Sequence, residues 1–597
     1  MHGDGALSAE TSFTDRLDTR IAGVLASLSG RPGIAALALV ALVLVLHLPG
    51  MLVLPPVDRT EVMYAQTAKQ MLEDGAWASP RFQADAQFEK PLAVLWLQAA
   101  SARLFGAADQ IWGYRLPALG GTLLAVLFTF FGVRALFGAS VALIGAALLA
   151  TMLVVTVQAT LAMPESLMLA ATCAALWSMA RVYGNRDGGS DWPAALTFWS
   201  ALGLGFLANV FTVALIALIV AASLIAWERG RAEWLWRLKP LFGIPLFLGI
   251  AALWPLALHL GGTLDAAIAE WRVGGLHLLL GPQEMKWRVV PGLFLLFLFL
   301  GLFPAGLFLA PAVIDGLRQW MDRRIAFLFA WAVPYVLLLE LLSRKTPLYM
   351  VQAALPPLAV LFAVWIDGDR ASSADHEQRW FRIGAHGWLA LVVVLVVAMW
   401  LLPFLLKLWV HPLAVALGLA ALAAASVATR AITAGHRYAA ATALVAMGLA
   451  FNTLALPVTL AGLRPVWVSS EIRAAVDALR KCAPGDVLVV GHTEPSVVFE
   501  LGTATVRSGD GAKSAELFGT RGGLAVVAEA QADAFLNHAH APPANVGCVA
   551  AYDFIKSCSH RFGVYSSTPE AYASCPLPER FSCRAVLKQP IIGRLCK

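Results

Sequence analysis

Thirteen segments of this 597-residue chain are apolar enough to cross a membrane as helices. A helix needs about 20 apolar residues to span the hydrocarbon core. The composition agrees, because 59% of the residues are hydrophobic and 14% are charged, whereas soluble domains carry roughly 25% charged residues. Collagen, a disordered chain, a disulfide-rich miniprotein and an ordinary cytosolic enzyme are therefore excluded. The expected spans are residues 33–54, 115–136, 139–160, 165–183, 192–209, 211–227, 240–261, 289–313, 325–343, 348–366, 387–406, 412–429 and 438–460.

The charges in the connecting loops predict how these spans are oriented. Lys and Arg concentrate in the cytoplasmic loops of membrane proteins. With a cytoplasmic N-terminus, every second loop is basic, from Arg134 to Arg437, whereas the short loops 161–164 and 210 on the other face carry neither residue. We therefore expect the C-terminus outside, after an odd number of spans. The net charge of +6 reflects this loop bias and does not indicate a nucleic-acid partner.

The chain divides into three parts on this basis. Residues 1–31 form an N-terminal segment, 32–465 the transmembrane domain and 466–597 a soluble domain. The N-terminal segment has apolar residues at helical spacing, which predicts an amphipathic helix lying on the membrane surface. These residues are Phe13, Leu17, Ile21, Val24 and Leu28.

The soluble domain contains six of the seven cysteines. An even set in a non-cytoplasmic domain indicates disulfides, with 15 pairings open for six cysteines. A metal site is the alternative, but no CxxC pair supports it. Apolar runs at 486–491, 503–507, 523–528 and 546–552, with helical patterns before and between them, predict a small α/β domain. We interpret the stretch from Gly491 to Pro495 as a strand-to-helix turn with an N-cap, rather than as a site of chemistry.

A long, charged loop follows the first span, at residues 55–114. Two amphipathic stretches, 60–73 and 91–105, predict helices that lie at the membrane interface without crossing it. Pro55 and Pro56 begin the loop and hold Asp58 close to the membrane plane. The alternative interpretation is an ordinary solvated loop.

This loop resembles the first periplasmic loop of polyprenyl-phosphate-dependent glycosyltransferases of the GT-C class, nearest to the ArnT-like and protein-mannosyltransferase-related branch (glycosyltransferase family 39-like). The resemblance implies a GT-C fold, an α-helical polytopic membrane protein with about 13 transmembrane helices and a C-terminal soluble α/β domain. It also implies the inner membrane of a Gram-negative cell, with a periplasmic C-terminal domain. The matching residues are Glu61, Tyr64-Ala65, Met71-Leu72, Gly75, Trp77, Glu89-Lys90-Pro91, Trp96-Leu97, Phe105-Gly106, Arg115-Leu116-Pro117 and the stretch from Ser343 to Tyr349.

Four functional positions depart from the family pattern. The family's catalytic Asp falls on Thr60 and its Arg on Met63, while a second acidic position reads Glu165. The family's Lys-Gly-Pro falls on Ala208-Asn209-Val210. Such a set of changes on an intact scaffold indicates a changed substrate, a relocated base or a lost activity.

Sugar transfer from a lipid phosphate requires positive charge for the departing phosphate and a carboxylate for the acceptor's proton. We expect Asp58 or Glu61 to be the base, assisted by Glu165. Lys90 and Lys345, with Arg115 and Tyr349, are expected to bind the donor phosphate. No metal ligand is assigned and no cofactor is certain, although a divalent metal could bridge Asp58, Glu61 and Glu165. Further expected cavity residues are Tyr64, Glu89, Arg272, Glu340 and Arg344.

Each of these roles has a structural alternative. Asp58 could be the N-cap of the helix at 60–73, and the two lysines could extend along the interface to reach water. Arg115 could be the buried structural partner of a loop carboxylate. Glu340 could pair with Arg344, one helical turn further on.

The sequence therefore predicts an integral-membrane glycosyltransferase. It would move a sugar from a polyprenyl-phosphate carrier to an envelope lipid similar to lipid A, or to a protein, at the periplasmic face. A catalytically inactive homologue that binds glycolipid or acts as a scaffold is the first alternative. A transporter of lipid-linked sugar is the second, although the inverted repeats typical of transporters are not visible.

Overall fold

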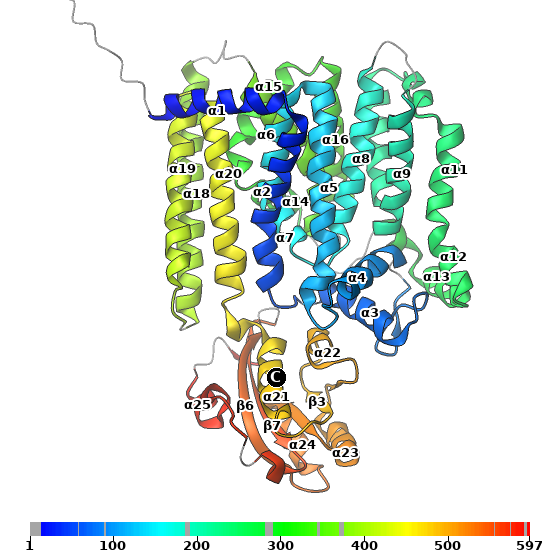
Figure 1. Ribbon diagram of the computed structural model, residues 1–597, viewed down its shortest axis with the longest axis vertical. Coiled ribbons are helices and arrows are strands. Elements are labelled where there is room, and N and C mark those ends of the chain that lie inside the picture. The colour runs from blue at the N-terminus through cyan, green and yellow to red at the C-terminus, as the bar shows by residue number, and fades with distance from the viewer. Residues whose placement is uncertain are drawn as a thin grey trace, which may run out of the picture.

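The computed structural model describes residues 13–57, 59–88, 91–185, 191–280, 290–342, 347–368, 375–406, 408–553, 556–572, 575–589 and 594–596. A bundle of long helices carries a smaller domain of strands and helices against one end (Figure 1). We call that end of the bundle the domain face and the opposite end the distal face. The expected fold class, a polytopic helical protein with a C-terminal α/β domain, is confirmed.

All thirteen expected spans are largely helical over their described residues. Within the described residues, nine helices are long and apolar enough to cross a membrane. They are α2 (Pro32–Val53), α5 (Ile111–Phe137), α8 (Glu165–Gly184), α11 with α12 (Pro240–Ala251, Leu253–Leu260), α16 (Arg323–Leu342), η3 with α17 (Leu348–Ala354, Leu355–Asp367), α18 (Asp375–Leu405), α19 (Pro412–Thr433) and α20 with η4 (Arg437–Thr453, Leu454–Leu460).

Two of the remaining expected spans are broken rather than straight. Helices α6 (Ala139–Thr151) and α7 (Leu153–Ala159) meet at 65°, and α14 (Leu293–Gly301) meets the segment Ala305–Arg318, which contains η2 and α15, at 109°. The second break contains Pro304, which lacks the N–H that a continuing helix needs.

The last two expected spans are separate helices, as the sequence indicated. Helix α9 (Trp192–Asn209) has 18 residues and α10 (Thr212–Trp227) has 16. Between them Val210 adopts a φ of +42°, a conformation that is rare for a β-branched residue.

Helix α1 (Phe13–Ser29) lies across the ends of the spans at the distal face (Figure 1). The carboxylate of Asp18 accepts a hydrogen bond from the Ala439 N–H at the start of α20 (2.9 Å). Of the predicted apolar face, Leu17, Ile21 and Leu28 pack against the bundle core, whereas Phe13 and Val24 are exposed.

The loop after α2 forms a packed layer between the bundle and the C-terminal domain (Figure 1). Its helices α3 (Thr60–Asp74) and α4 (Leu92–Leu104) lie close to the predicted positions, with a short hairpin of β1 (Arg81–Phe82) and β2 (Asp85–Ala86) between them. Val62, Leu95 and Ala99 share one buried cluster with Trp254 and Leu258 of α12. The layer is therefore part of the core, not a solvated loop.

The C-terminal domain is a mixed sheet between two layers of helices. The strand order is β4-β3-β5-β7-β6, in which the β4, β3 and β5 neighbours are parallel and the β5, β7 and β6 neighbours antiparallel. Alternate residues of β3 face opposite clusters. The elements are α21 (Val468–Arg480), β3 (Val487–Val490), α22 (Ser496–Leu501), β4 (Val506–Ser508), α23 (Gly511–Arg521), β5 (Leu524–Ala528), α24 (Glu529–Asn537), β6 (Ala544–Asp553), β7 (Cys558–Ser566), α25 (Cys583–Lys588) and β8 (Arg594–Leu595).

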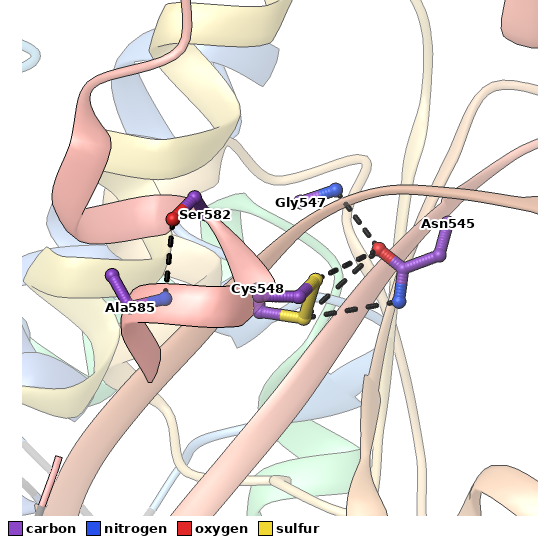
Figure 2. Close-up of a disulfide and its surroundings, with 6 residues drawn as sticks. Asn545, Gly547, Cys548, Ser582 and Ala585 are labelled. Atoms are coloured by element: carbon purple, nitrogen blue, oxygen red, sulfur yellow. Dashed lines mark hydrogen bonds between the residues drawn. A yellow bond between two sulfur atoms is a disulfide. The ribbon is translucent and has the colours of Figure 1, made fainter. Parts of the chain in front are cut away.

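The expected disulfides are present. The six cysteines of the domain pair as Cys482–Cys575, Cys548–Cys583 and Cys558–Cys596. Figure 2 shows the bond at Cys548 beside Asn545, whose side-chain oxygen accepts a hydrogen bond from the Gly547 N–H (3.0 Å). The same view shows Ser582 accepting from the Ala585 N–H (3.2 Å), which caps α25. Each disulfide joins the sheet or α21 to the last segment of the chain.

Candidate active site

A buried ion pair organises the domain face of the bundle. Arg115 lies in the first turns of α5 and Glu61 in the first turn of α3, and both side chains are almost completely buried. Arg115 Nε donates to Glu61 Oε1 (2.6 Å) and Nη2 donates to Oε2 (2.9 Å). This two-point geometry is the strongest form of arginine–carboxylate pairing.

The remaining polar groups of the pair bind backbone. Arg115 Nη1 donates to the carbonyls of Met51 (3.0 Å) and Leu54 (2.5 Å), and Nη2 donates to the carbonyl of Pro55 (2.9 Å). All five guanidinium N–H donors are thereby engaged. The Glu61 carboxylate also accepts from the backbone N–H groups of Val57 (2.8 Å) and Ala162 (2.8 Å).

This geometry changes the roles expected for the two residues. A base must have a lone pair within reach of the acceptor's proton, but Glu61 already accepts four hydrogen bonds. A phosphate ligand needs free donors, and those of Arg115 are engaged within the protein. Glu61 and Arg115 therefore hold the end of α2, helix α3 and the 160–164 connection together, which is the structural alternative stated for Arg115.

Glu165 lies one short connection away from this pair. Ala162 is fixed through its N–H by Glu61 and through its carbonyl by Gln98 Nε2 (2.9 Å). Three residues later, Glu165 begins α8 and is buried. Its backbone carbonyl accepts from Nε2 of the buried Gln352 (3.0 Å). The Glu61–Arg115 pair thus positions the start of α8, where Glu165 lies.

Gln352 belongs to η3, which also contains Tyr349. Trp331 Nε1 donates to the carbonyl of Ala353 (2.8 Å), and the Tyr335 hydroxyl donates to that of Met350 (3.1 Å). These bonds fix η3 against α16. Tyr349 is half-buried in this turn, so the structure brings two expected site residues, Glu165 and Tyr349, onto adjoining elements. Sequence analysis did not single out Gln352, which joins them.

Tyr64 is buried in the cluster that packs the loop against the bundle. It lies three residues after Glu61, near the start of α3. Tyr64 and Glu165 are therefore the described candidates next to the Glu61–Arg115 pair, because Tyr64 shares α3 with Glu61 and Glu165 follows the connection that Glu61 binds.

Two expected cavity residues lie in other settings. Glu340 accepts hydrogen bonds from the backbone N–H groups of Gly292 (2.8 Å) and Leu295 (2.6 Å) at the start of α14. Its carboxylate therefore caps a helix, where it also complements the helix dipole. Arg272 is exposed on α13 (Leu264–Leu280). The predicted pairing of Glu340 with Arg344 involves a residue outside the described part of the chain.

Five expected site residues lie outside the described residues, and the structure places only their neighbours. These five are Asp58, Glu89, Lys90, Arg344 and Lys345. Arg59, the residue after Asp58, is the N-cap residue of α3, and its side chain makes no capping hydrogen bond to the helix. Before Glu89, the carbonyl of the buried Phe88 accepts from Trp271 Nε1 of α13 (2.9 Å). Pro347 is the first described residue after Lys345, and it directly precedes η3.

The C-terminal domain touches the loop through a contact that sequence analysis missed. Arg59 Nε donates to Glu494 Oε2 (2.8 Å) and Nη2 donates to Oε1 (3.0 Å). Glu494 lies in the expected turn between β3 and α22, although α22 has no side-chain N-cap. The sequence predicts a turn from Gly491 to Pro495 but gives no sign that Glu494 contacts the loop. We call the bonds between loop residues 59–83 and domain residues 494–507 the docking contact.

Polar bonds extend the docking contact along α3. The Thr503 hydroxyl accepts from Gln66 Nε2 (2.7 Å) and donates to Glu73 Oε2 (2.6 Å). Gln83 Nε2 donates to the carbonyls of Thr503 (3.1 Å) and Thr505 (2.8 Å). The domain is therefore bound along the length of α3.

The turn of the loop hairpin is shaped for this contact. Gln83 adopts a φ of +54°. Gln70 holds it in this conformation, accepting from the Gln83 N–H (2.8 Å) and donating to the Gln83 carbonyl (2.8 Å). A strained backbone at an anchored position of this kind costs of order 1–3 kcal/mol, which the surrounding bonds must offset.

An aromatic side chain lies at the centre of the docking contact. Phe499 of α22 packs edge-on against Tyr114 of α5, with ring centroids 5.7 Å apart. The Lys69 ammonium lies 5.3 Å from the centre of the same ring and pairs with Asp109 (2.8 Å). Phe499 also belongs to the buried cluster of the loop layer. The domain thus contributes to the core beneath α3.

The charge of Glu494 is stabilised by two cations. Burial opposes ionisation of this carboxyl, but the hydrogen bonds and charge of Arg59, together with Lys556 at 3.5 Å, hold the pKa of Glu494 below its ordinary value. The carboxylate therefore remains ionised, and the docking contact remains charge-assisted, at neutral pH.

We expect Glu494→Gln to loosen the N-terminal turn of α3. Half of the Arg59 side chain is exposed, so the loss is expected to be about 1 kcal/mol. Hydrogen exchange at residues 59–66 should become faster in the variant. Glu500→Gln is the matched control, because Glu500 pairs with Arg473 (2.5 Å) inside the same domain. Equal exchange rates at α3 in Glu494→Gln and the wild type would contradict the role given to the Arg59–Glu494 bond.

The described residues give no support to a metal at the Glu61–Glu165 position. Two clusters of three His, Cys or Asp side chains have ligand atoms within 4.8 Å of one another, and both lie in the C-terminal domain. Neither contains Glu61 or Glu165, and the third member of the expected metal set, Asp58, lies outside the described residues.

The amino-acid sequence is similar to those of known glycosyltransferases. Residues 89–255 match the family model of dolichyl-phosphate-mannose-protein mannosyltransferases. The chain is 29% identical over 314 residues to undecaprenyl phosphate-alpha-4-amino-4-deoxy-L-arabinose arabinosyl transferase 1 of Pseudomonas fluorescens, covering 50% of this chain and 54% of the relative. It is 30% identical over 328 residues to the corresponding transferase of Pseudomonas aeruginosa, with 50% and 54% covered. The chain thus spans about half the length of the curated relatives it matches.

The fold extends the likeness to almost the whole chain. The crystal structure of ArnT from Cupriavidus metallidurans bound to undecaprenyl phosphate superposes with a TM-score of 0.69 at 19% identity, covering 91% of this chain and 99% of the other. The fold expected from the loop motifs is therefore confirmed, because the chain has the architecture of this ArnT crystal structure.

Proposed function

We propose that this chain, an ArnT-like protein of the GT-C fold, transfers a sugar from a polyprenyl-phosphate carrier to a glycolipid acceptor of the cell envelope. The observation that carries the proposal is the sequence match to curated arabinosyl transferases whose names specify an undecaprenyl-phosphate donor. A packed loop layer at the domain face, in the position expected for the family's first loop, supports it. The acceptor is proposed to resemble lipid A, with a protein as the less favoured acceptor.

The proposed orientation puts the domain face in the periplasm and the protein in the inner membrane. Three disulfides in the C-terminal domain support this side, because structural disulfides persist in oxidising compartments. The basic loops at Arg134 and Arg437 adjoin the distal face, where a cytoplasmic location agrees with the positive-inside rule. The N-terminal helix α1 would then lie on the cytoplasmic surface.

The proposed reaction is a single displacement at the anomeric carbon of the sugar. The bond from that carbon to the carrier's phosphate oxygen breaks, and a bond to the acceptor oxygen forms. The phosphate leaves with the electron pair, and its charge is balanced by Lys90 and Lys345. The proton of the acceptor passes to Asp58, with Glu165 assisting.

Glu61 and Arg115 have a different part in this proposal. They are positioning residues, because they hold α3 and the start of α8 in place. Tyr64 lies on α3 three residues after Glu61, Tyr349 lies on η3 beside the start of α8, and Glu89 precedes Lys90 in the loop. No metal is needed for the displacement as written.

The experiment is mass spectrometry of glycolipids from membranes of cells with and without this protein. Asp58→Asn and Glu165→Gln are compared with the control Asp109→Asn, whose side chain is exposed apart from its bond to Lys69. We expect a glycolipid with one added sugar that disappears in the deletion and in both site variants and persists in the control. Persistence in both site variants would show that the acids are wrongly assigned.

A second candidate is a glycolipid-binding or scaffold protein without catalysis. The observation that favours it is the replacement of the family's acidic and basic positions by Thr60 and Met63. It predicts no change in glycolipid mass on deletion although the folded protein is present. Appearance of a sugar-bearing product in Thr60→Asp alone would support this candidate, whereas loss of an existing product in Asp58→Asn would exclude it.

A further inference from the structure

Three side chains with metal-binding atoms meet inside the C-terminal domain. His492 follows the end of β3, Asp553 ends β6 and His560 lies on β7. All three are buried, and one ligand atom of each lies within 4.8 Å of those of the other two. The two imidazole rings face each other edge to face, with centroids 5.4 Å apart. Strands β3, β6 and β7 thus bring two imidazoles and a carboxylate together.

The hydrogen bonding of this cluster is incomplete within the protein. Both ring nitrogens of His492, which is 1% exposed, have no hydrogen-bond partner among the described residues. His560 Nε2 lies 3.6 Å from Asp553 Oδ2, which is too far for a hydrogen bond. Leaving a buried polar group unpaired costs roughly 1–3 kcal/mol. A native fold therefore retains such a set only if something satisfies it.

We propose that His492, Asp553 and His560 bind one divalent transition-metal ion, and that Zn²⁺ is the ion that fits best. Two imidazoles and one carboxylate are an established Zn²⁺ ligand set, with a fourth position left for water. Ca²⁺ and Mg²⁺ are disfavoured because they take oxygen ligands. Ligand atoms at about 2.0–2.2 Å from a tetrahedral ion lie roughly 3.4 Å from one another. Those of this cluster all lie within 4.8 Å of one another, so each pair needs to approach by at most about 1.4 Å.

The carboxylate of the cluster is held in place by a backbone hydrogen bond. Asp553 Oδ1 accepts from the Lys556 N–H (2.9 Å), which fixes the carboxylate and directs Oδ2 to the two histidines.

A second grouping, Cys558, His560 and Cys596, is excluded as the ligand set. Its two cysteines form a disulfide with each other, and the metal ligand is the thiolate. Of the two groupings, His560 can therefore bind a metal ion only together with His492 and Asp553. The disulfide instead anchors β7 beside the proposed site.

Lys556 is the group that competes with a cation here. Its Nζ lies 3.8 Å from Asp553 Oδ2 and 3.5 Å from Glu494 Oε1, and its side chain is 40% exposed. A bound ion would coordinate Asp553 and displace the Lys556 ammonium from it. Lys556 would then pair with Glu494 alone, the residue that binds Arg59 in the docking contact. Metal binding and docking are thus connected through one flexible ammonium group.

The test is metal content of the purified full-length protein in detergent, without reductant so that the disulfides persist. The protein is stripped with a chelator, incubated with Co²⁺ or Zn²⁺ and passed through a desalting column. We expect about one ion per chain and the visible absorption of tetrahedral Co²⁺. His492→Gln and Asp553→Asn should each lose the ion and this absorption.

The matched control is His538→Gln, because His538 is an exposed histidine directly after α24 in the same domain. It should keep the ion. Thermal unfolding of the stripped proteins shows whether each variant is folded, and His492→Gln, which preserves size, remains the deciding variant if Asp553→Asn unfolds. Wild-type protein that retains no more ion than folded His492→Gln would overturn the proposal. So would equal loss of the ion in the His538→Gln control.

Discussion

Arg115→Met is expected to destabilise the protein by about 3–5 kcal/mol, the usual cost of removing one member of a buried ion pair. The reason is that Glu61 would remain buried as a carboxylate without its cation. In addition, the carbonyls of Met51, Leu54 and Pro55 would each lose a donor. The change would therefore release the end of α2 from α3.

The measurement is the thermal unfolding of the detergent-solubilised variant, with the fraction of folded protein followed by size-exclusion chromatography. Arg81→Met is the matched control in the same loop, because Arg81 forms a half-exposed pair with Asp74 (3.1 Å) and should change stability by about 0–1 kcal/mol. The double variant Glu61→Gln/Arg115→Met should lose less than the sum of its single changes. Equal stability of Arg115→Met and Arg81→Met would show that the buried pair does not hold the loop.

Removal of the Cys482–Cys575 disulfide is expected to have an effect of similar size. Its two cysteines are 93 residues apart, and the chain-entropy model assigns about 4.7 kcal/mol to a closed loop of roughly 100 residues. The bond joins Cys482, two residues after the end of α21, to the segment beyond β7. Without it, the C-terminal segment would be free to separate from α21 in the unfolded chain.

The measurement compares Cys482→Ala/Cys575→Ala with Cys548→Ala/Cys583→Ala, whose cysteines are 35 residues apart. The same model predicts a smaller loss for the shorter loop, by about 0.9 kcal/mol. Unfolding of the domain is followed by protease susceptibility under non-reducing conditions. A larger loss for the shorter loop would show that native packing around Cys548, and not loop entropy, decides the cost.

The membrane helices were predictable because their signal is local. A run of apolar residues of the required length identifies a span without knowledge of its neighbours. The breaks at Met152 and Pro304 were not predicted, because both lie inside runs that remain apolar. Strand β7 was missed for a related reason: Ser559, His560 and Arg561 interrupt its apolar pattern, although its pairing with β5 and β6 stabilises it.

The site was predictable only in part. The loop motifs indicated that Glu61, Arg115 and Glu165 matter, but no spacing rule shows that Glu61 and Arg115, 54 residues apart, use all their hydrogen bonds on one another and on backbone. The cap formed by Glu340 likewise depends on where α14 begins. Gln352 carried no signal, because one buried amide in an apolar run indicates nothing about its partner.

The docking contact has a consequence for how the protein matures. Arg59 and Glu494 are separated by 435 residues, so at about 5–20 residues per second the first loop waits roughly 20–90 s for its partner. During that interval α3 lacks the side of its packing that Phe499 provides. The loop layer is thus completed only after the C-terminal domain has been made, although it is synthesised early, directly after α2.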